Sequence, residues 1–235
     1  MKKYRFPLTC CAVLTLLVGC SSLSDSNASN SEQVISGGER GDHTAQLFWV
    51  TQNKNGVSHA ADYVAADNGD HYKTTYEWTD DVVREVSRHG EQLQQGEVVP
   101  FETLLRFDTH GDAIYQRYRV DGKVFPLSQK QIDQYRQQAR SVLKVTTSDH
   151  KQGVSLIQGY WNGQTFESCD GQVSHTLTYN HTVPASVIER LATSDSYIAF
   201  VGKRSKEAVR IETMLMFEDS HHECVTPLSD PEDED

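Results

Sequence analysis

Alternating polar and apolar positions dominate the stretch from residue 45 to residue 125 and predict β-strands. In 113–120, for example, Ile114, Gln116, Tyr118 and Val120 fall on one face of an extended chain. The expected strands span 45–51, 59–66, 71–78, 82–88, 91–99, 101–108, 113–120 and 123–125. Short connections between them favour an antiparallel meander over residues 45–126.

Turn residues separate these strands. Asn55-Gly56, Asn68-Gly69 and Asp121-Gly122 supply the positive φ angles that tight hairpins require. We also expect turns at His89-Gly90 and at Val99-Pro100, because glycine and proline commonly interrupt strands.

A different period begins after Pro126 and predicts one amphipathic helix over residues 127–150. Ser128 and Gln131 have the spacing of a capping box, which closes the first turn of a helix. Apolar side chains then recur at helical spacing and form a single stripe: Ile132, Tyr135, Ala139 and Val142.

The strand pattern returns in residues 151–228. Three expected strands (154–160, 164–169 and 175–181) precede a short helix after Pro184, and two more follow at 197–202 and 208–217. This order fits a small barrel of the oligonucleotide/oligosaccharide-binding type, although a half-sandwich packed on the first region fits it too. The predicted fold class is therefore α+β and mostly antiparallel β.

The N-terminus has the three zones of an export signal. Lys2, Lys3 and Arg5 precede an apolar run over 8–18, which is too short to span a bilayer. The run ends in Leu17-Val18-Gly19-Cys20, which resembles the lipobox of bacterial lipoproteins. The resemblance implies cleavage before Cys20, acylation of Cys20 and, with Ser21 next, transport to the outer membrane of a Gram-negative bacterium. An ordinary secretory signal is the alternative.

Composition extends this picture to both ends of the mature chain. Residues 20–44 are rich in Ser, Asn, Asp and Gly, and we expect a lipidated flexible tether there. Residues 229–235 form an acidic tail that is expected to be disordered. Removing residues 1–19 would remove three of the 22 basic residues and no acidic one, so the formal net charge falls from −11 to −14. That charge excludes the basic surface typical of nucleic-acid binding.

The cysteine count follows from this compartment. Cys10 and Cys11 lie in the signal and Cys20 carries lipid, so Cys169 and Cys224 remain. In an oxidising periplasm they are expected to form a disulfide. Metal ligation by Cys224 with His221 and His222 is the alternative, although the spacing matches no known zinc pattern.

Catalytic motifs are missing from the sequence, so neither an enzyme class nor a cofactor is indicated. Asp80-Asp81 and Glu218-Asp219 could bind a cation but suit an acidic surface equally. The aromatic stretch around Trp161 and Phe166 could be a carbohydrate platform or could pack the barrel.

Several of these features together resemble the YjaH-like family of gammaproteobacterial lipoproteins: the lipobox, Arg117-Tyr118-Arg119-Val120-Asp121-Gly122, the glutamine-rich helix, and the 160–171 stretch with Cys224. The resemblance implies an envelope lipoprotein and no particular activity. The leading hypothesis is a non-enzymatic accessory, held in the bilayer by Cys20, that binds an envelope protein or glycan. A periplasmic hydrolase of cell-wall material and a metal-responsive protein are the alternatives.

Overall fold

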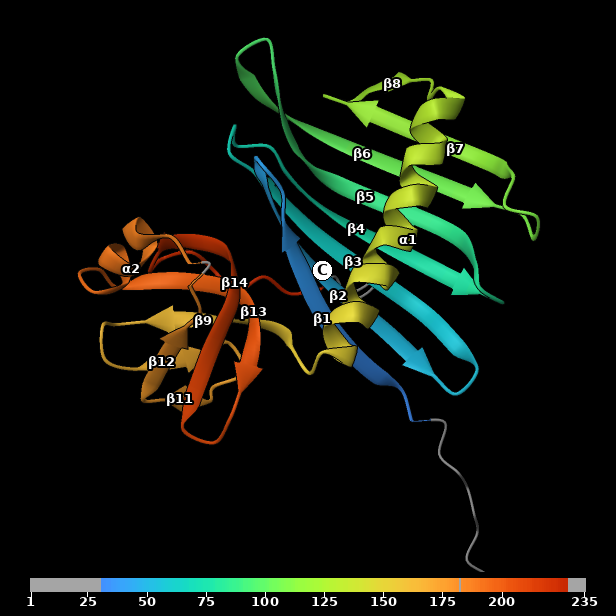
Figure 1. Ribbon diagram of the computed structural model, residues 1–235. Coiled ribbons are helices and arrows are strands. Elements are labelled where there is room, and N and C mark those ends of the chain that lie inside the picture. Colours follow the sequence, from blue (N-terminus) through green and yellow to red (C-terminus); the bar gives the residue numbers. More distant parts are fainter. Residues whose placement is uncertain (1–30, 182, 228–235) are drawn as a thin grey trace, which may run out of the picture.

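The computed structural model describes residues 31–181 and 183–227, and it contains two β regions and one long helix (Figure 1). The predicted signal peptide, the lipobox with Cys20, and the tail 229–235 lie outside the described residues. No helix in the described ranges is long and apolar enough to cross a membrane.

The first region is an eight-stranded antiparallel meander in which each strand pairs with the next along the chain. Its strands are β1 (Gln33–Arg40), β2 (Thr44–Asn53), β3 (Gly56–Ala66), β4 (His71–Thr79), β5 (Val82–Gln94), β6 (Glu97–Phe107), β7 (Ala113–Val120) and β8 (Lys123–Phe125). The predicted meander is thus confirmed.

The expectation of a flexible tether over residues 20–44 is wrong for residues 33–40. These residues form strand β1 and pair with β2 along the whole strand. The glycines that suggested flexibility allow close packing on both sides. A side chain at Gly37 would collide with Asp149 of the long helix, and one at Gly38 would collide with the Gln46 carbonyl and Leu215. Composition alone therefore misjudged this segment, since tertiary packing orders it.

The expected turns at His89-Gly90 and Val99-Pro100 are wrong. Strands β5 and β6 run straight through these positions, and the hairpin turns instead at Gln95 and Gly96, whose φ angles are 55° and 90°. The Pro100 carbonyl accepts a hydrogen bond from the Asp121 N–H at the end of β7. In an antiparallel sheet, the N–H and the C=O of one residue point to the same neighbouring strand. The N–H that Pro100 lacks would therefore point to the end of β7, where its absence interrupts no ladder of hydrogen bonds.

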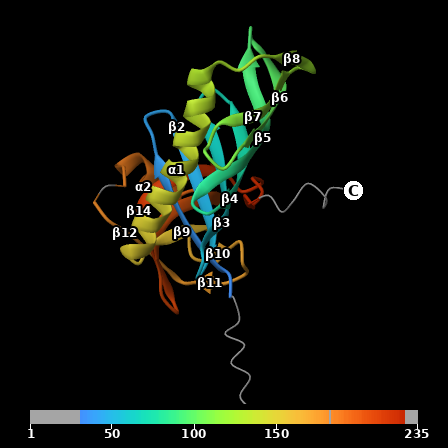
Figure 2. The ribbon, with the colours of Figure 1, turned by 90° about the vertical axis from the view of Figure 1, so that its right-hand side faces the viewer.

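Helix α1 (Gln129–Lys151) crosses one face of the meander diagonally, as Figures 1 and 2 show. Ser128 and Gln131 form the predicted capping box. The buried side of the helix packs on apolar residues of the sheet such as Phe48, Tyr76 and Leu105. The buried residues of the helix are Ile132, Ala139, Val142 and Thr146.

The second region is a barrel-like six-stranded sheet with the order β11-β10-β9-β13-β14-β12. Its elements are β9 (Ser155–Trp161), β10 (Phe166–Ser168), β11 (Val173–Ser174), β12 (Thr176–Tyr179), α2 (Ala185–Leu191), β13 (Ser196–Arg204) and β14 (Ala208–Asp219). β11 and β12 are separated only by His175, so together they pair with β10 on one side and, in parallel, with β14 on the other. This closure and the helix before β13 give the predicted barrel topology.

The two regions share a core. Strand β2 directs Leu47 toward the barrel and Phe48 toward α1, while β13 directs Tyr197 toward the meander and Phe200 into the barrel. Both strands are buried on both faces, which explains their nearly continuous apolar runs.

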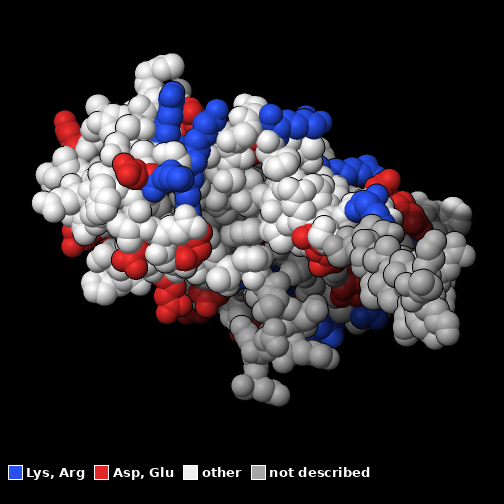
Figure 3. Space-filling model, turned by 90° about the horizontal axis from the view of Figure 1, so that it is seen from below, with Lys and Arg blue, Asp and Glu red and all other residues white. Residues whose placement is uncertain are grey.

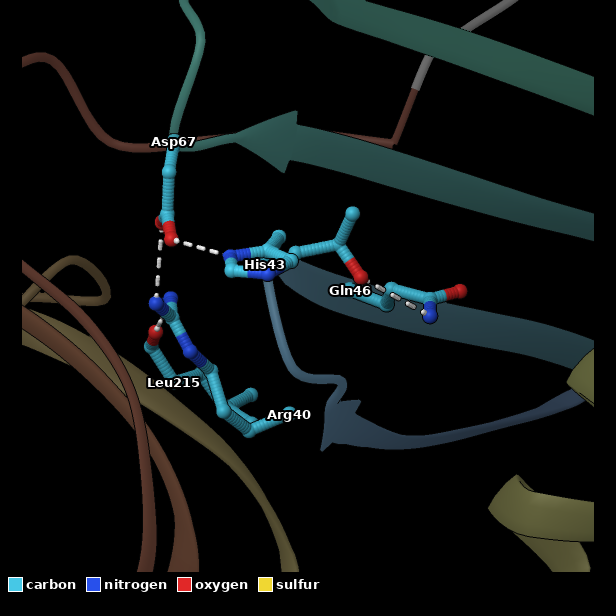
Figure 4. A network of polar contacts seen from close by, with 6 residues as sticks. Arg40, His43, Gln46, Asp67 and Leu215 are labelled. Atoms are coloured by element: carbon cyan, nitrogen blue, oxygen red, sulfur yellow. Dashed lines mark hydrogen bonds and ion pairs between the residues drawn. The ribbon is translucent and has the colours of Figure 1, made fainter.

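A polar network closes the rim of this interface (Figure 4). Arg40 donates to the Leu215 carbonyl of β14 at 3.0 Å and to Asp67 at 3.1 Å, and His43 lies 3.4 Å from the same carboxylate. One arginine thereby connects the β3–β4 turn with the barrel.

Candidate binding cleft beside helix α1

A row of polar residues crosses the helix-facing side of the meander. Strand register places Asp62 opposite Thr74, Thr74 opposite Arg88, and Arg88 opposite Thr103. All four are buried although the face is otherwise apolar. Buried polar groups need partners, and helix α1 supplies several of them.

Arg88 is held rigidly between two aromatic rings. Its guanidinium carbon lies 4.0 Å from the ring centre of Tyr72 and 4.5 Å from that of Tyr135. Its Nε donates to Thr74 Oγ1 at 2.9 Å, and its Nη2 donates to Gln138 Oε1 at 2.7 Å. Burial lowers the pKa of Arg88, but Tyr76, Tyr72 and Asp62 outweigh that effect, so the guanidinium stays protonated. The side chain is therefore a fixed positive charge.

Asp62 lies behind this arginine and anchors the network. Its Oδ2 accepts hydrogen bonds from Tyr76 at 2.6 Å and from Gln138 at 3.2 Å, whereas Oδ1 has no partner among the described residues. Burial raises the pKa of Asp62, and the charge of Arg88 and the hydrogen bonds oppose only part of that rise. Burial also raises the pKa of Tyr76 well above its ordinary value.

A cleft of about 450 Å³ opens above Arg88, between α1 and the sheet. This volume lies in the range of small-molecule sites. Its walls combine aromatic rings and side-chain amides around the guanidinium: Tyr72, Phe101, Tyr118, Tyr135, Gln92, Gln131, Gln134 and Gln138. Rings stack on apolar faces of a ligand, and amides both donate and accept hydrogen bonds. The cleft is thus suited to a polar ring compound that carries negative charge.

The hydrolase alternative would need catalytic groups that face this cleft. Glycoside hydrolysis ordinarily uses two carboxyl groups facing the substrate. Asp70 is the one carboxylate among the described lining residues, and its oxygens already accept from Leu93 N–H at 2.6 Å and from Asn68 at 3.0 Å. Asp62 is not among the wall residues, because its side chain is buried beneath Gln138, which donates to it at 3.2 Å.

Of the residues that the sequence singled out, Cys169 and Cys224 form the predicted disulfide, with Cα atoms 6.0 Å apart. Cys224 is therefore no thiolate ligand, which overturns the metal site proposed with His221 and His222. The His222 ring instead stacks on Tyr197, with ring centres 4.5 Å apart.

Two further candidates have structural roles. Phe166 is fully buried in the barrel, and the Trp161 indole donates to the Leu191 carbonyl at 2.7 Å, so this stretch packs the barrel rather than displaying a platform. Asp80 and Asp81 both have positive φ angles and form the β4–β5 hairpin turn. None of these residues reaches the cleft.

The fold and the cleft together describe a two-region β protein with a small, polar-lined cleft beside α1. Residues 36–228 match a family described as Protein of unknown function (DUF1481), and the chain belongs to this family. No significant match was found among curated proteins or solved structures.

Proposed function

We propose that the protein is a lipoprotein of the Gram-negative cell envelope, anchored in the outer membrane through acylated Cys20, whose periplasmic cleft binds an acidic glycan. The observation that carries the binding role is the buried, charged Arg88 clamped between two rings at the base of the cleft. The lipobox sequence and the resemblance to YjaH-like lipoproteins support the envelope location.

The chemistry of the cleft favours a glycan over a protein partner. A volume of about 450 Å³ accommodates one or two sugar rings, whereas protein partners usually bury a broad surface. Sugar hydroxyls match the glutamine amides, and a sugar carboxylate would complement Arg88.

Calorimetry with two disaccharides tests this proposal. N-acetylglucosamine linked to N-acetylmuramic acid carries a carboxylate, whereas chitobiose is its neutral counterpart. We expect the acidic disaccharide to bind more tightly. Arg88→Lys, which keeps the charge but loses the planar stacking and the fork of donors, should weaken that binding by about tenfold.

Arg106→Lys is the matched control, because Arg106 pairs with Glu85 on the surface away from the cleft. Equal binding of both sugars, or equal loss in both variants, would contradict a charge-selective cleft.

The anchor is tested separately by labelling cells with radioactive palmitate. Cys20→Ala should abolish labelling and release the protein from the membrane fraction, while Cys11→Ala should change neither. Continued labelling of Cys20→Ala would refute the anchor without affecting the cleft.

A further inference from the structure

Helix α1 carries a basic stripe on the flank opposite the glycan cleft. Arg140, Lys144 and Lys151 are spaced by four and seven residues, so they lie on one side of the helix together with Thr147. All three cations are exposed. Figure 3 shows the molecule from below, and several Lys and Arg side chains lie along the upper rim of this view.

These cations have no counter-ion in the described part of the chain, where none of the three side chains forms an ion pair or a hydrogen bond. Arg136, one turn earlier on the same flank, shows the contrast. It bonds to Asp133 and to the Gly111 carbonyl. In a chain with a formal net charge of −11, three unpaired cations side by side call for an explanation.

Helix electrostatics account for Lys151 alone. A cation in the last turn complements the negative end of the helix dipole, but this effect fades within one turn. Arg140 and Lys144 lie further inside, and like charges four residues apart destabilise a helix. Their placement makes physical sense if a bound anion neutralises them.

The stripe borders a groove of about 680 Å³ between α1 and the β4–β5 turn. Trp78 and Leu143 give this groove an apolar part, and Thr147 and Ser148 add hydroxyls. Trp78 is 8% exposed, and its indole N–H has no hydrogen-bond partner among the described residues. This N–H is itself buried from solvent, so Trp78 offers the groove the apolar surface of its indole ring and no hydrogen-bond donor. Asp81 is the one carboxylate among the groove residues.

We propose that this groove binds an anionic amphiphile, namely the phosphate diester headgroup of a phospholipid. The guanidinium and the two ammonium groups would bind the phosphate oxygens. The carbon chain next to the headgroup would lie on Trp78 and Leu143. This inference does not depend on the glycan cleft or on acylation of Cys20.

Calorimetry with monomeric dihexanoyl-phosphatidylglycerol tests the groove. The full chain with Cys20→Ala avoids interference from an acyl anchor and is suitable whether or not Cys20 is acylated. We expect the short-chain lipid to bind, and the triple variant Arg140→Gln, Lys144→Gln, Lys151→Gln to weaken it roughly tenfold or more. Dihexanoyl-phosphatidylcholine should bind more weakly because its headgroup carries no net charge.

The control triple Lys54→Gln, Lys130→Gln, Lys206→Gln removes the same charge from exposed lysines outside the groove. It should leave binding nearly unchanged. Equal loss in both triple variants would show attraction by overall charge and would overturn the proposal, as would failure of the wild-type groove to bind the lipid. Glycerol 3-phosphate should bind more weakly than the lipid, and equal binding would overturn the amphiphile assignment.

Discussion

The two β regions solve the same problem of burying a sheet in different ways. The barrel closes on itself through the parallel pair of β12 and β14 and fills its interior with apolar side chains such as Phe166, Ile198 and Phe200. The meander stays open, is covered by α1, and buries a polar row with Arg88 at its centre. A closed barrel of this size leaves little interior space for a ligand, whereas a helix laid across an open sheet leaves a cleft on each flank. Both proposed sites lie against α1, and the described residues that line them come from the meander, α1 and the segments next to α1.

The largest expected effect comes from a substitution in the core of the barrel. Phe200 is fully buried, so Phe200→Ala should lower the free energy of unfolding by about 3–5 kcal/mol. Because Leu47 of β2 and Tyr197 of β13 share one core, the meander should unfold in the same transition. Urea denaturation followed by both circular dichroism and tryptophan fluorescence measures this. Two separate transitions would show that the regions are independent.

The second largest expected effect comes from removing the disulfide between Cys169 and Cys224. Replacing both Cys169 and Cys224 by alanine should cost about 2–4 kcal/mol, since the bridge restricts the unfolded chain over a separation of 55 residues. The bridge lies in the barrel region, so lipid and sugar binding at the α1 grooves should survive at temperatures where the variant is folded. Denaturation and calorimetry of the same sample test both statements. Loss of binding in the folded variant would contradict the placement of both sites against α1.

Strand β1 tests how tightly the regions meet. Gly38→Ala should cost about 1–3 kcal/mol, because the new methyl would meet the backbone carbonyl of Gln46 in β2 and the Leu215 side chain of the barrel. Gly37→Ala is the matched control and should cost less, because it meets the side chain of Asp149, which can shift at the loss of one hydrogen bond from the Gly38 N–H. Thermal unfolding of both variants provides the measurement. A larger loss of stability in Gly37→Ala than in Gly38→Ala would show that the contact of β1 with α1 is tighter than its contact with the barrel.

The smallest expected effect is a pH dependence under α1. Burial raises the folded-state pKa of Asp62 above 3.8, so the folded state holds more protons than the unfolded one between these two values. Wild-type stability should therefore fall relative to Asp62→Asn as the pH rises from 3.8 through the raised pKa.

Asp133→Asn is the control for that experiment. The hydrogen bond from Arg136 lowers the pKa of Asp133, so its stabilising contribution is present above 3.8 and is lost as the pH falls through the lowered pKa. Urea denaturation from pH 3 to pH 7 gives, for each variant, the free energy of unfolding of the wild type minus that of the variant. As the pH rises, this difference should fall for Asp62→Asn and rise for Asp133→Asn, so the two slopes should have opposite signs. Slopes of the same sign would contradict the assigned environments.

Local patterns predicted much of this fold. Alternation identified the meander, Ser128 and Gln131 marked the start of α1, and the cysteine count identified the disulfide. The failures at Gly37-Gly38 and Gly90 share a cause: glycine there permits close packing inside a strand rather than a turn. Such packing depends on neighbours that the local sequence does not contain.

The cleft was missed for a related reason. Arg88 and Gln138 are 50 residues apart in the chain, and strand register and helix crossing bring them together. One signal was available nonetheless. Asp62 alternates with Ala60 and Val64 on the inward side of its strand, and a carboxylate at such a position indicates a buried polar site.

The start of β1 at Gln33 also limits the length of the tether that follows Cys20. From Cys20 to Gln33 the backbone reaches at most about 45 Å, roughly half of what a tether ending at residue 44 would allow. Strand β1 enters the sheet where Gln33 pairs with Gln52, next to the β2–β3 turn, and Gly56 of that turn lies beside Asp81 of the lipid groove. With Cys20 anchored as proposed, a short tether joins the membrane to the start of β1, at the end of the sheet nearest the basic stripe. A short tether attached there would favour orientations in which the stripe lies close to the membrane.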